Sequence, residues 1–314
     1  MRNYVGLDVG GTTMKGALVT AAGEIIFRAE QETCPHLGLD AVLDRMVALV
    51  DQVARAEGRS LGDVCGVGVG VPAFLDWATG FVETAVNLGW SQVPLRAELQ
   101  KRLGDLPIAL DNDANAAAFG EALVGGGSGA RDALCVTLGT GVGGGILIDG
   151  KLVRGASGMG GEIGHIMLDE EGWLCNCGRR GCLETISSAT GIVRAAVDRM
   201  LAGDESSLAA ERSLSAALIF DHAARGDRLS CEVIEHAIDR LAFVLANIGT
   251  TLNPPVMLIG GGVSQAGEAL LAPLKRAFDR YALPRVRRAT EIRLATLGND
   301  AGVIGAAMLL VEEL

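Results

Sequence analysis

Short apolar runs separated by glycine turns fill the first thirty residues of the chain. Residues 4–10 (YVGLDVG) form an apolar run, residues 14–20 (MKGALVT) alternate between polar and apolar side chains, and residues 24–30 (EIIFRAE) begin another apolar run. Such runs are typical of β-strands when turn residues bound them. The pattern therefore predicts three strands in succession.

The period then changes to that of a helix, because apolar residues recur three and four positions apart. They lie on one predicted face: Val42, Met46, Leu49, Val50 and Val53. Residues 63–72 (DVCGVGVGVP) and 107–113 (PIALDND) predict two further buried strands, and the alanine-rich residues 114–123 predict a helix.

The opening pattern returns from Ala133 onward. Residues 133–141 (ALCVTLGTG) predict a strand and a glycine turn, residues 144–150 (GGILIDG) a strand and a turn, and residues 151–155 (KLVRG) a third strand. This weak internal repeat indicates two halves of similar topology.

The remainder is mainly helical. Helices are predicted over 191–201, 214–226 and 231–253, then a strand running into a glycine turn over 256–264, another helix, a strand over 292–298 and a closing helix over 300–314. A chain of 314 residues is long enough for two domains. We expect a small domain of residues 1–117 plus 301–314 and a large domain of residues 118–300.

Composition and charge narrow the possible partners. Hydrophobic residues make up 49% of the chain and charged residues 21%, which is typical of a globular protein, and the formal net charge is −11. Nucleic acids and anionic membranes attract basic surfaces, so we expect neither as a partner. The N-terminus lacks the apolar core of a signal peptide, and the seven cysteines are an odd, thinly spread set. These features predict a cytoplasmic protein with reduced thiols.

Three of the seven cysteines fall in one window, CNCGRRGC at residues 175–182. A disulfide between Cys175 and Cys177 would be badly strained, and a redox pair needs the spacing C-x-x-C. Three thiolates and the imidazole of His165 would instead make a Cys3His set, which is typical of structural zinc. The alternative is a chance cluster of buried, small apolar residues. We predict structural Zn²⁺ held by His165, Cys175, Cys177 and Cys182, in a loop that Gly178 and Gly181 allow to fold tightly.

Three predicted strands end in glycine turns, at residues 8–16, 138–144 and 259–264. The second contains G-x-G-x-x-G, but the helix that a dinucleotide-binding fingerprint requires is replaced by an alternating hairpin with an Asp-Gly turn. Glycine turns can offer backbone N–H groups to phosphate oxygens, although most are simple hairpins. Three of them in a duplicated α/β pattern, with Asp8 and Lys15 beside the first, indicate a nucleotide cleft between two domains.

Five segments together resemble the ROK family of repressors, open reading frames and sugar kinases: DVGGTTMKG, DNDANAAAFGE, LGTGVGGGI, GGEIGH and CNCGRRGCLE. The similarity runs nearly end to end, and AVNLGW with ETISSATGIVR makes it greatest to bacterial ROK glucokinases. The resemblance implies an α/β, actin/hexokinase-like (ribonuclease H-like) duplicated fold with two domains around a nucleotide and sugar cleft. It also implies ATP and Mg²⁺ as cofactors.

The resemblance assigns Asp113 as the catalytic base, because a sugar hydroxyl must lose its proton as the phosphoryl group transfers. The alternative from local pattern is that Asp113 only caps the following helix. Sugar-binding residues implied by the family are Asn87, Asn112, Asp113, Glu162, His165 and Glu184. Residues implied to bind Mg-ATP are Asp8, Gly10, Gly11, Thr12, Thr13, Lys15, Thr140, Gly141, Gly261 and Gly262.

The expected activity is transfer of phosphate from ATP to the 6-hydroxyl of glucose, a small-molecule sugar. One departure bears on the sugar: similar glucokinases often carry Pro-Gly where this chain has Pro72–Ala73. The alternatives are kinases for N-acetylglucosamine, N-acetylmannosamine, mannose or fructose, and a ROK sugar-sensing regulator. Regulators carry a DNA-binding segment before the first glycine motif, which begins here at Asp8, so we expect a kinase. The resemblance also implies a homodimer or homotetramer.

Overall fold

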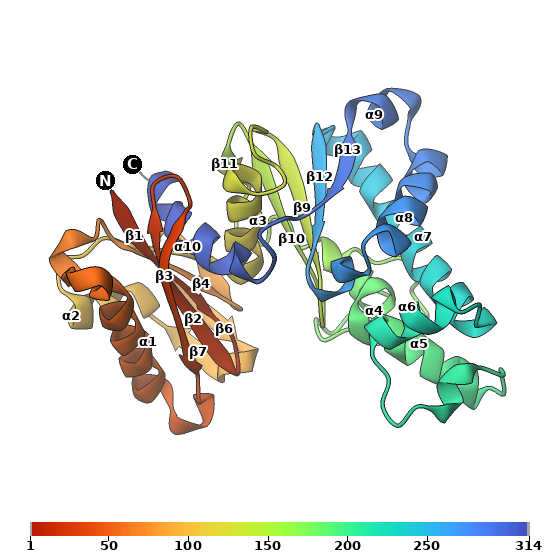
Figure 1. The fold of residues 1–314 in the computed structure, drawn as a ribbon, viewed down its shortest axis with the longest axis horizontal. Coiled ribbons are helices and arrows are strands. Elements are labelled where there is room, and N and C mark those ends of the chain that lie inside the picture. The colour runs from red at the N-terminus through yellow and green to blue at the C-terminus, as the bar shows by residue number, and fades with distance from the viewer. Residues whose placement is uncertain (1, 313–314) are drawn as a thin grey trace. The chain divides into compact units, whose positions relative to one another are not determined.

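The computed structural model describes residues 2–312, and the chain divides into two compact units (Figure 1). Unit 1 comprises Met1–Arg131, Gly145–Gly161 and Leu297–Leu314, and unit 2 comprises Asp132–Gly144 and Glu162–Thr296. The predicted domains, 1–117 plus 301–314 and 118–300, differ from this division. Residue 117 lies inside one continuous helix, so a boundary there would separate residues that fold as one element.

Unit 1 is built on a five-stranded sheet with the order β3-β2-β1-β4-β8. Its strands are β1 (Asn3–Val9), β2 (Thr13–Thr20), β3 (Ile25–Glu32), β4 (Val67–Val71) and β8 (Ile108–Asn112). The first three pair antiparallel, as their alternation and tight turns predict, whereas β1, β4 and β8 pair parallel. All residues of β4 are buried, as is usual for a parallel strand covered on both faces.

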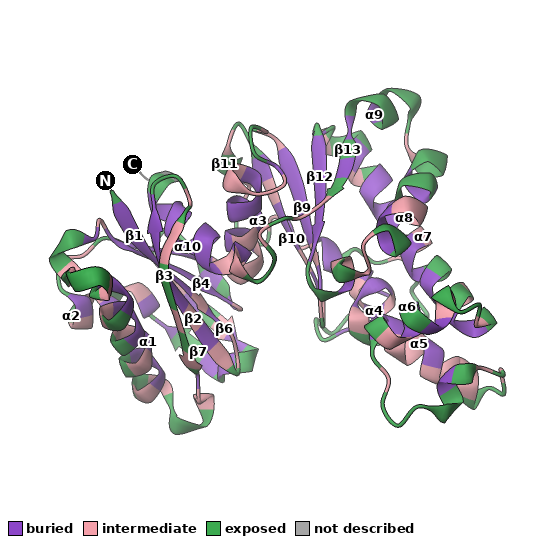
Figure 2. Ribbon diagram, in the orientation of Figure 1, coloured by how far each residue is buried: buried purple, intermediate pink, exposed green. Residues whose placement is uncertain are grey.

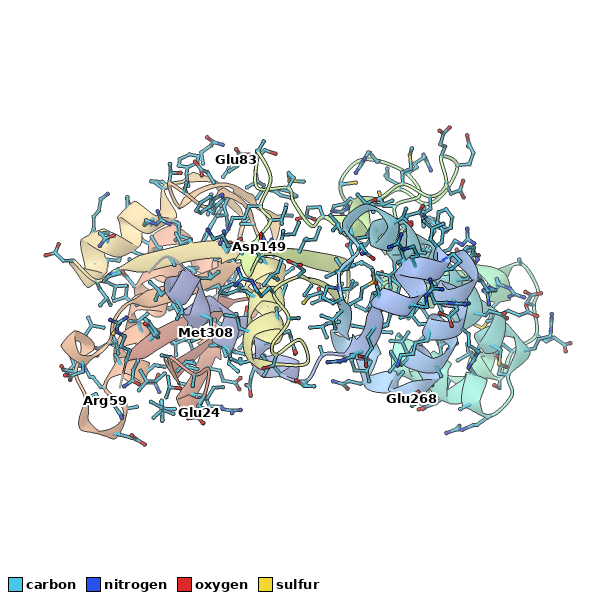
Figure 3. All side chains as sticks on the ribbon, turned by 90° about the horizontal axis from the view of Figure 1, so that it is seen from above. Glu24, Arg59, Glu83, Asp149, Glu268 and Met308 are labelled. Carbon is cyan, nitrogen blue, oxygen red and sulfur yellow. The ribbon has the colours of Figure 1, made fainter. Side chains whose placement is uncertain are left out.

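Helices cover both faces of this sheet. Helix α1 (Leu39–Ala54) packs on β1, β2 and β3, and all five of its predicted apolar positions are buried (Figure 2). Helix α10 (Ala301–Glu312) packs on β1 and β4, and α3 (Asp113–Val124) packs against α10. Met308 of α10, labelled in Figure 3, is 1% exposed. The last two residues of the predicted closing helix lie outside the described residues.

A small antiparallel sheet of unit 1 was not predicted. It has the order β5-β6-β7, with β5 (Phe74–Asp76), β6 (Phe81–Ala85) and β7 (Trp90–Val93), and α2 (Leu95–Leu103) follows it. Its strands have three to five residues, too few for a clear period of two.

The second large sheet repeats the topology of the first. Its order is β11-β10-β9-β12-β13, with β9 (Ala133–Leu138), β10 (Val142–Ile148), β11 (Lys151–Leu152), β12 (Val256–Gly260) and β13 (Glu291–Leu294). Numbered by order along the chain, each sheet reads 3-2-1-4-5, so the predicted duplication is confirmed. The predicted Asp-Gly turn joins β10 to β11, with positive φ at Asp149 (Figure 3) and Gly150. The strand predicted over 151–155 is wrong beyond Leu152, because β11 ends there and a loop follows that carries Arg154.

Unit 2 contains the four predicted helices: α5 (Ala189–Leu201), α6 (Ala216–Ala224), α7 (Arg228–Leu252) and α8 (Glu268–Tyr281). Two short helices, α4 (Glu184–Ser187) and α9 (Pro284–Ala289), were not predicted. Helix α7 packs against α5, α6, α8 and α9, and its buried residues repeat at helical spacing. Within residues 2–312, no helix has the length and apolarity that a membrane span requires.

Backbone-to-backbone packing of α10 depends on glycines that carry no Cβ. A methyl group on Gly68 of β4 would lie 1.7 Å from the carbonyl oxygen of Ala306, and one on Gly6 of β1 would lie 2.0 Å from that of Val303. A methyl group on Gly305 would lie 1.7 Å from the carbonyl oxygen of Ala116 in α3. These glycines therefore set how closely α10 approaches the sheet and α3.

Gly68→Ala should lower the free energy of unfolding by about 1–3 kcal/mol, because the new methyl group must push α10 away from β4. The measurement is urea denaturation followed by circular dichroism. The matched control is Gly62→Ala, since a methyl group there meets only the Ser60 hydroxyl at 3.7 Å; it should change the free energy by less than about 0.5 kcal/mol. Equal effects of the two substitutions would contradict this account.

Candidate functional site

The first glycine turn joins β1 to β2 in unit 1 and is held at both ends. Gly10 N–H donates to the carbonyl oxygen of Thr13 (3.0 Å), and the Thr33 hydroxyl donates to the carbonyl oxygen of Gly10 (2.7 Å). Thr33 N–H donates to the carbonyl oxygen of Thr12 (2.8 Å), while the Thr12 side chain is exposed. The turn is therefore preformed, with Gly11 and Thr12 at its tip.

Asp8 and Lys15 are cross-strand partners beside this turn. Burial raises the pKa of the Asp8 carboxyl, and the positive charge of Lys15 opposes that rise. A methyl group on Gly302 would lie 2.5 Å from Asp8 Oδ2, so the first turn of α10 lies against this carboxylate. The carboxylate is poorly hydrated, and a further cation near it would stabilise its charged form.

Asn87 also lies beside the turn. A methyl group on Gly11 would lie 3.1 Å from both Cβ and the carbonyl oxygen of Asn87. The exposed Asn87 side chain belongs to a short 3₁₀ helix (Val86–Leu88) between β6 and β7. Unit 1 therefore brings together a predicted sugar residue and the predicted phosphate turn.

The junction of β8 and α3 carries Asn112 and Asp113, both half-buried. Asn112 is the N-cap of α3, because its Oδ1 accepts from the N–H groups of Ala114 (2.8 Å) and Asn115 (3.3 Å). Its Nδ2 donates to the carbonyl oxygen of Ala73 (3.3 Å). The helix thus begins at Asp113 rather than Ala114, and the capping role considered for Asp113 belongs to Asn112. Asp113 Oδ1 accepts from Ala114 N–H (2.9 Å).

Two residues next to this junction were missed by the sequence reasoning. Asp111 is buried, and its carboxylate pairs with Arg154 at 2.6 Å. The sequence did carry a signal for Asp111, because an acidic residue in an otherwise apolar strand needs a buried partner. Arg154 gave none, because its loop had been predicted as a strand.

In unit 2, the backbone of Val142 holds the second glycine turn. Val142 N–H donates to Glu184 Oε2 (3.0 Å), and a methyl group on Gly164 would lie 2.0 Å from the Val142 carbonyl oxygen. Gly139 N–H donates to the carbonyl oxygen of Gly141 (2.9 Å), which closes the turn.

Thr140 is exposed at the tip of this turn, and its carbonyl oxygen accepts from the Thr190 hydroxyl. The third turn lies next to it, because β9 and β12 are parallel neighbours. Gly261 has φ 82°, and a methyl group there would lie 2.5 Å from the Leu138 carbonyl oxygen. Gly262 begins a 3₁₀ helix (Gly262–Ala266). Unit 2 thus gathers Thr140, Gly141, Gly261 and Gly262 at one edge of its sheet.

The predicted metal ligands converge in unit 2. One donor atom from each of His165, Cys175, Cys177 and Cys182 lies within 4.8 Å of the others. Cys177 Sγ and Cys182 Sγ are 3.6 Å apart, and Cys175 Sγ is 3.5 Å from His165 Nδ1. Zinc–sulfur bonds of about 2.3 Å in a tetrahedron place two sulfur atoms about 3.8 Å apart, so the set fits one tetrahedral ion. Gly178 and Gly181 have positive φ, as the predicted tight loop requires.

The other ring nitrogen of His165 faces a carboxylate. His165 Nε2 lies 3.8 Å from Glu162 Oε2, in the short turn Glu162–His165. Burial raises the pKa of Glu162, the histidine lowers it, and the negative charge of Glu184 raises it further. Unit 2 therefore places Glu162, His165 and Glu184 close together, with Glu184 Oε1 3.6 Å from Cys175 Sγ.

Comparison with known proteins identifies the class to which these features belong. The model of the ROK family matches residues 4–313. A glucokinase from Halalkalibacterium halodurans is 45% identical over 99% of this chain and 96% of its own length. A ROK hexokinase from Thermus thermophilus has a TM-score of 0.86 at 29% identity, covering 99% of this chain and 100% of its own. A ROK family glucokinase from Streptomyces griseus, solved with glucose and AMPPNP, has a TM-score of 0.81 at 34% identity, covering 98% of both chains.

The fold is the duplicated actin/hexokinase-like α/β fold predicted from the sequence, with a preformed glycine turn in each half. The chain belongs to the ROK family.

Proposed function

We propose that this chain transfers the γ-phosphoryl group of ATP to the 6-hydroxyl of glucose. The observation that carries the proposal is the carboxylate of Asp113 at the first position of α3, in a chain that is 45% identical over nearly its full length to a glucokinase. A base at a strand-to-helix junction is held by regular structure on both sides, so its direction is fixed.

In the proposed reaction the sugar 6-oxygen attacks the γ-phosphorus while the bond to the ADP oxygen breaks. Asp113 accepts the proton that the hydroxyl loses. Asn112 holds the junction through its cap, and the sugar contacts proposed with it are Asn87, Glu162, His165 and Glu184.

The glycine turns are the segments proposed to bind ATP. The proposed phosphate contacts in unit 1 are Gly10, Gly11, Thr12, Thr13 and Lys15, and those in unit 2 are Thr140 and Gly141. Gly261 and Gly262 are proposed to line the adenosine side. The half-buried carboxylate of Asp8 offers the hard oxygen ligand that Mg²⁺ prefers, directly or through water. When bound with ATP, Mg²⁺ neutralises charge on the phosphates.

Zinc is the metal proposed for the Cys3His cluster. The four donors would fix the loop 175–182, and Nδ1 of His165 would be the histidine ligand, because it is the ring nitrogen beside Cys175. Nε2 would then face Glu162 and the sugar. Cytoplasmic location and assembly into a homodimer or homotetramer stay predictions.

Asp113→Asn should lower kcat by roughly 10²- to 10⁴-fold with little change in KM for glucose, because the amide keeps the shape but cannot accept the proton. The measurement is a coupled assay of ADP formation. Asp105→Asn, an exposed change in the same unit, should leave kcat unchanged. Retention of more than about a tenth of wild-type kcat would show that Asp113 is not the base.

Glucose should give the highest kcat/KM among glucose, mannose, fructose, N-acetylmannosamine and N-acetylglucosamine. N-acetylglucosamine should fall at least about tenfold below glucose, because a site shaped around a 2-hydroxyl crowds an acetamide. The same panel on Ala73→Gly tests the departure at Pro72–Ala73, where the Ala73 carbonyl oxygen is held by Asn112. A preference for an N-acetylhexosamine in the wild type would overturn glucose as the substrate.

Purified protein should carry about one zinc per chain, measured by elemental analysis of native enzyme. Cys177→Ala should lose the metal, lower the thermal midpoint and raise KM for glucose more than KM for ATP, because the loop orients His165 and Glu184. Cys231→Ala, an exposed cysteine outside the cluster, should keep the metal and both KM values. An active, zinc-free wild type would contradict the assignment.

A further inference from the structure

We propose that Arg154 is a positioning residue for phosphoryl transfer. Its ion pair with Asp111 would hold the strand end and first helical turn that carry Asn112 and Asp113. The inference rests on the proposed role of Asp113 as the base, and adds to it the support that gives this carboxylate its direction.

The Asp111 carboxylate accepts hydrogen bonds from residues before and after Asp113. Its Oδ1 accepts from Asn112 N–H (2.8 Å) and from Asn115 Nδ2 (2.8 Å), so it joins the end of β8 to the first turn of α3. Its Oδ2 accepts from Arg154 Nε (2.6 Å). Asp113 lies between these attachments, and therefore a rotation of Asp111 breaks a hydrogen bond on either side of it.

Burial makes Asp111 depend on Arg154. The side chain of Asp111 is 3% exposed and that of Arg154 is 12% exposed. A buried carboxylate without a cation is strongly destabilised and turns toward water or gains a proton. Because Arg154 Nε lies 2.6 Å from Oδ2, its charge offsets the lost hydration of the Asp111 carboxylate and directs that carboxylate inward.

Arg154 is itself held by a second loop. Its guanidinium lies 4.5 Å from the ring centroid of Trp77, which covers one face of it. Arg96 fixes the backbone of that loop by donating to the carbonyl oxygens of Trp77 (2.9 Å) and Ala78 (2.6 Å). Gly160 N–H donates to the Arg154 carbonyl oxygen (2.8 Å), which closes the loop that carries the arginine. Arg154 is therefore held both at its backbone and at its guanidinium group.

The test compares the wild type with Arg154→Met, Arg154→Lys and the control Arg102→Met, which removes ion pairs to Asp40, Asp44 and Glu98 in the same unit. Arg154→Met should lower kcat about 10- to 100-fold, the cost expected of a displacement near 1 Å at the base. KM for ATP should change less than about threefold, because the phosphate turns are untouched. Arg154→Lys should recover part of kcat, and Arg102→Met should keep kcat within about twofold of wild type.

The double variant Asp111→Asn/Arg154→Met separates positioning from stability. Removing the carboxylate charge relieves the unpaired buried ion, so the thermal midpoint should rise above that of Arg154→Met. The kcat should stay low, because the bond that directs the junction is still missing. If kcat recovers together with the midpoint, or if Arg154→Met behaves like Arg102→Met, the positioning role is wrong.

Failure of this inference differs from failure of the proposed function. A wild type without glucose-dependent ADP formation, or an active Asp113→Asn variant, overturns the function and with it the role of Arg154. An active wild type and an inactive Asp113→Asn variant beside an unimpaired Arg154→Met variant overturn only the positioning role. If Arg154→Met does not yield folded protein, Arg154→Lys and the double variant decide the question by the same two readouts.

Discussion

The contact between α10 and the backbone of unit 1 supports two parts of the candidate site in that unit: the first glycine turn and the start of α3. Gly6 and Gly68 let the helix lie directly on β1 and β4, and β1 carries Asp8 and runs into the first glycine turn. Gly302 brings the first turn of α10 against the Asp8 carboxylate, and Gly305 brings α10 against α3, which begins at Asp113. One helix from the C-terminal end of the chain is therefore the common support of the proposed phosphate turn and the proposed base. Close packing transmits small displacements, so the spacing of these groups depends on the absence of a few methyl groups.

In unit 2, the backbone of Val142 connects several parts of the candidate site. The N–H of Val142 is bound by Glu184 and its carbonyl oxygen is approached by Gly164. Gly164 belongs to the turn that carries His165, and Glu184 directly follows the cysteine loop. The glycine turn, the histidine turn and Glu184, which follows the cysteine loop, therefore meet at one residue, Val142. The proposed metal ligands are thus connected to the proposed phosphate turn as well as to the proposed sugar contacts, which spacing along the sequence did not indicate.

The sequence predicted the parts of the fold that repeat a period and missed those that depend on contacts. The apolar face of α1 and the strands of the first sheet follow from hydrophobic spacing, because burial on one face is a local constraint on every turn or pleat. The convergence of His165 with the cysteine loop also followed, because four donors of the right kind are specific chemistry. The β5-β6-β7 sheet was missed because its strands are too short to show a period. The division into units differs from the predicted domains because α3 and residues 145–161 group with unit 1.

Asp111 and Arg154 show why the remainder of a site resists prediction. In the sequence, Asp111 is the first letter of DND and is indistinguishable in type from the proposed base two residues later. The structure separates them by environment: Asp111 is 2% exposed and bound to Arg154, whereas Asp113 is half-buried at the start of a helix. An apolar pair in place of the ion pair could stabilise the fold equally well, since desolvation offsets much of the Coulomb attraction between buried charges. Apolar contacts have no preferred direction, whereas hydrogen bonds from Asn112, Asn115 and Arg154 fix the orientation of one carboxylate. Close packing at the glycines sets the distance of the β8–α3 junction from α10, and the buried Asp111–Arg154 pair is proposed to orient the junction.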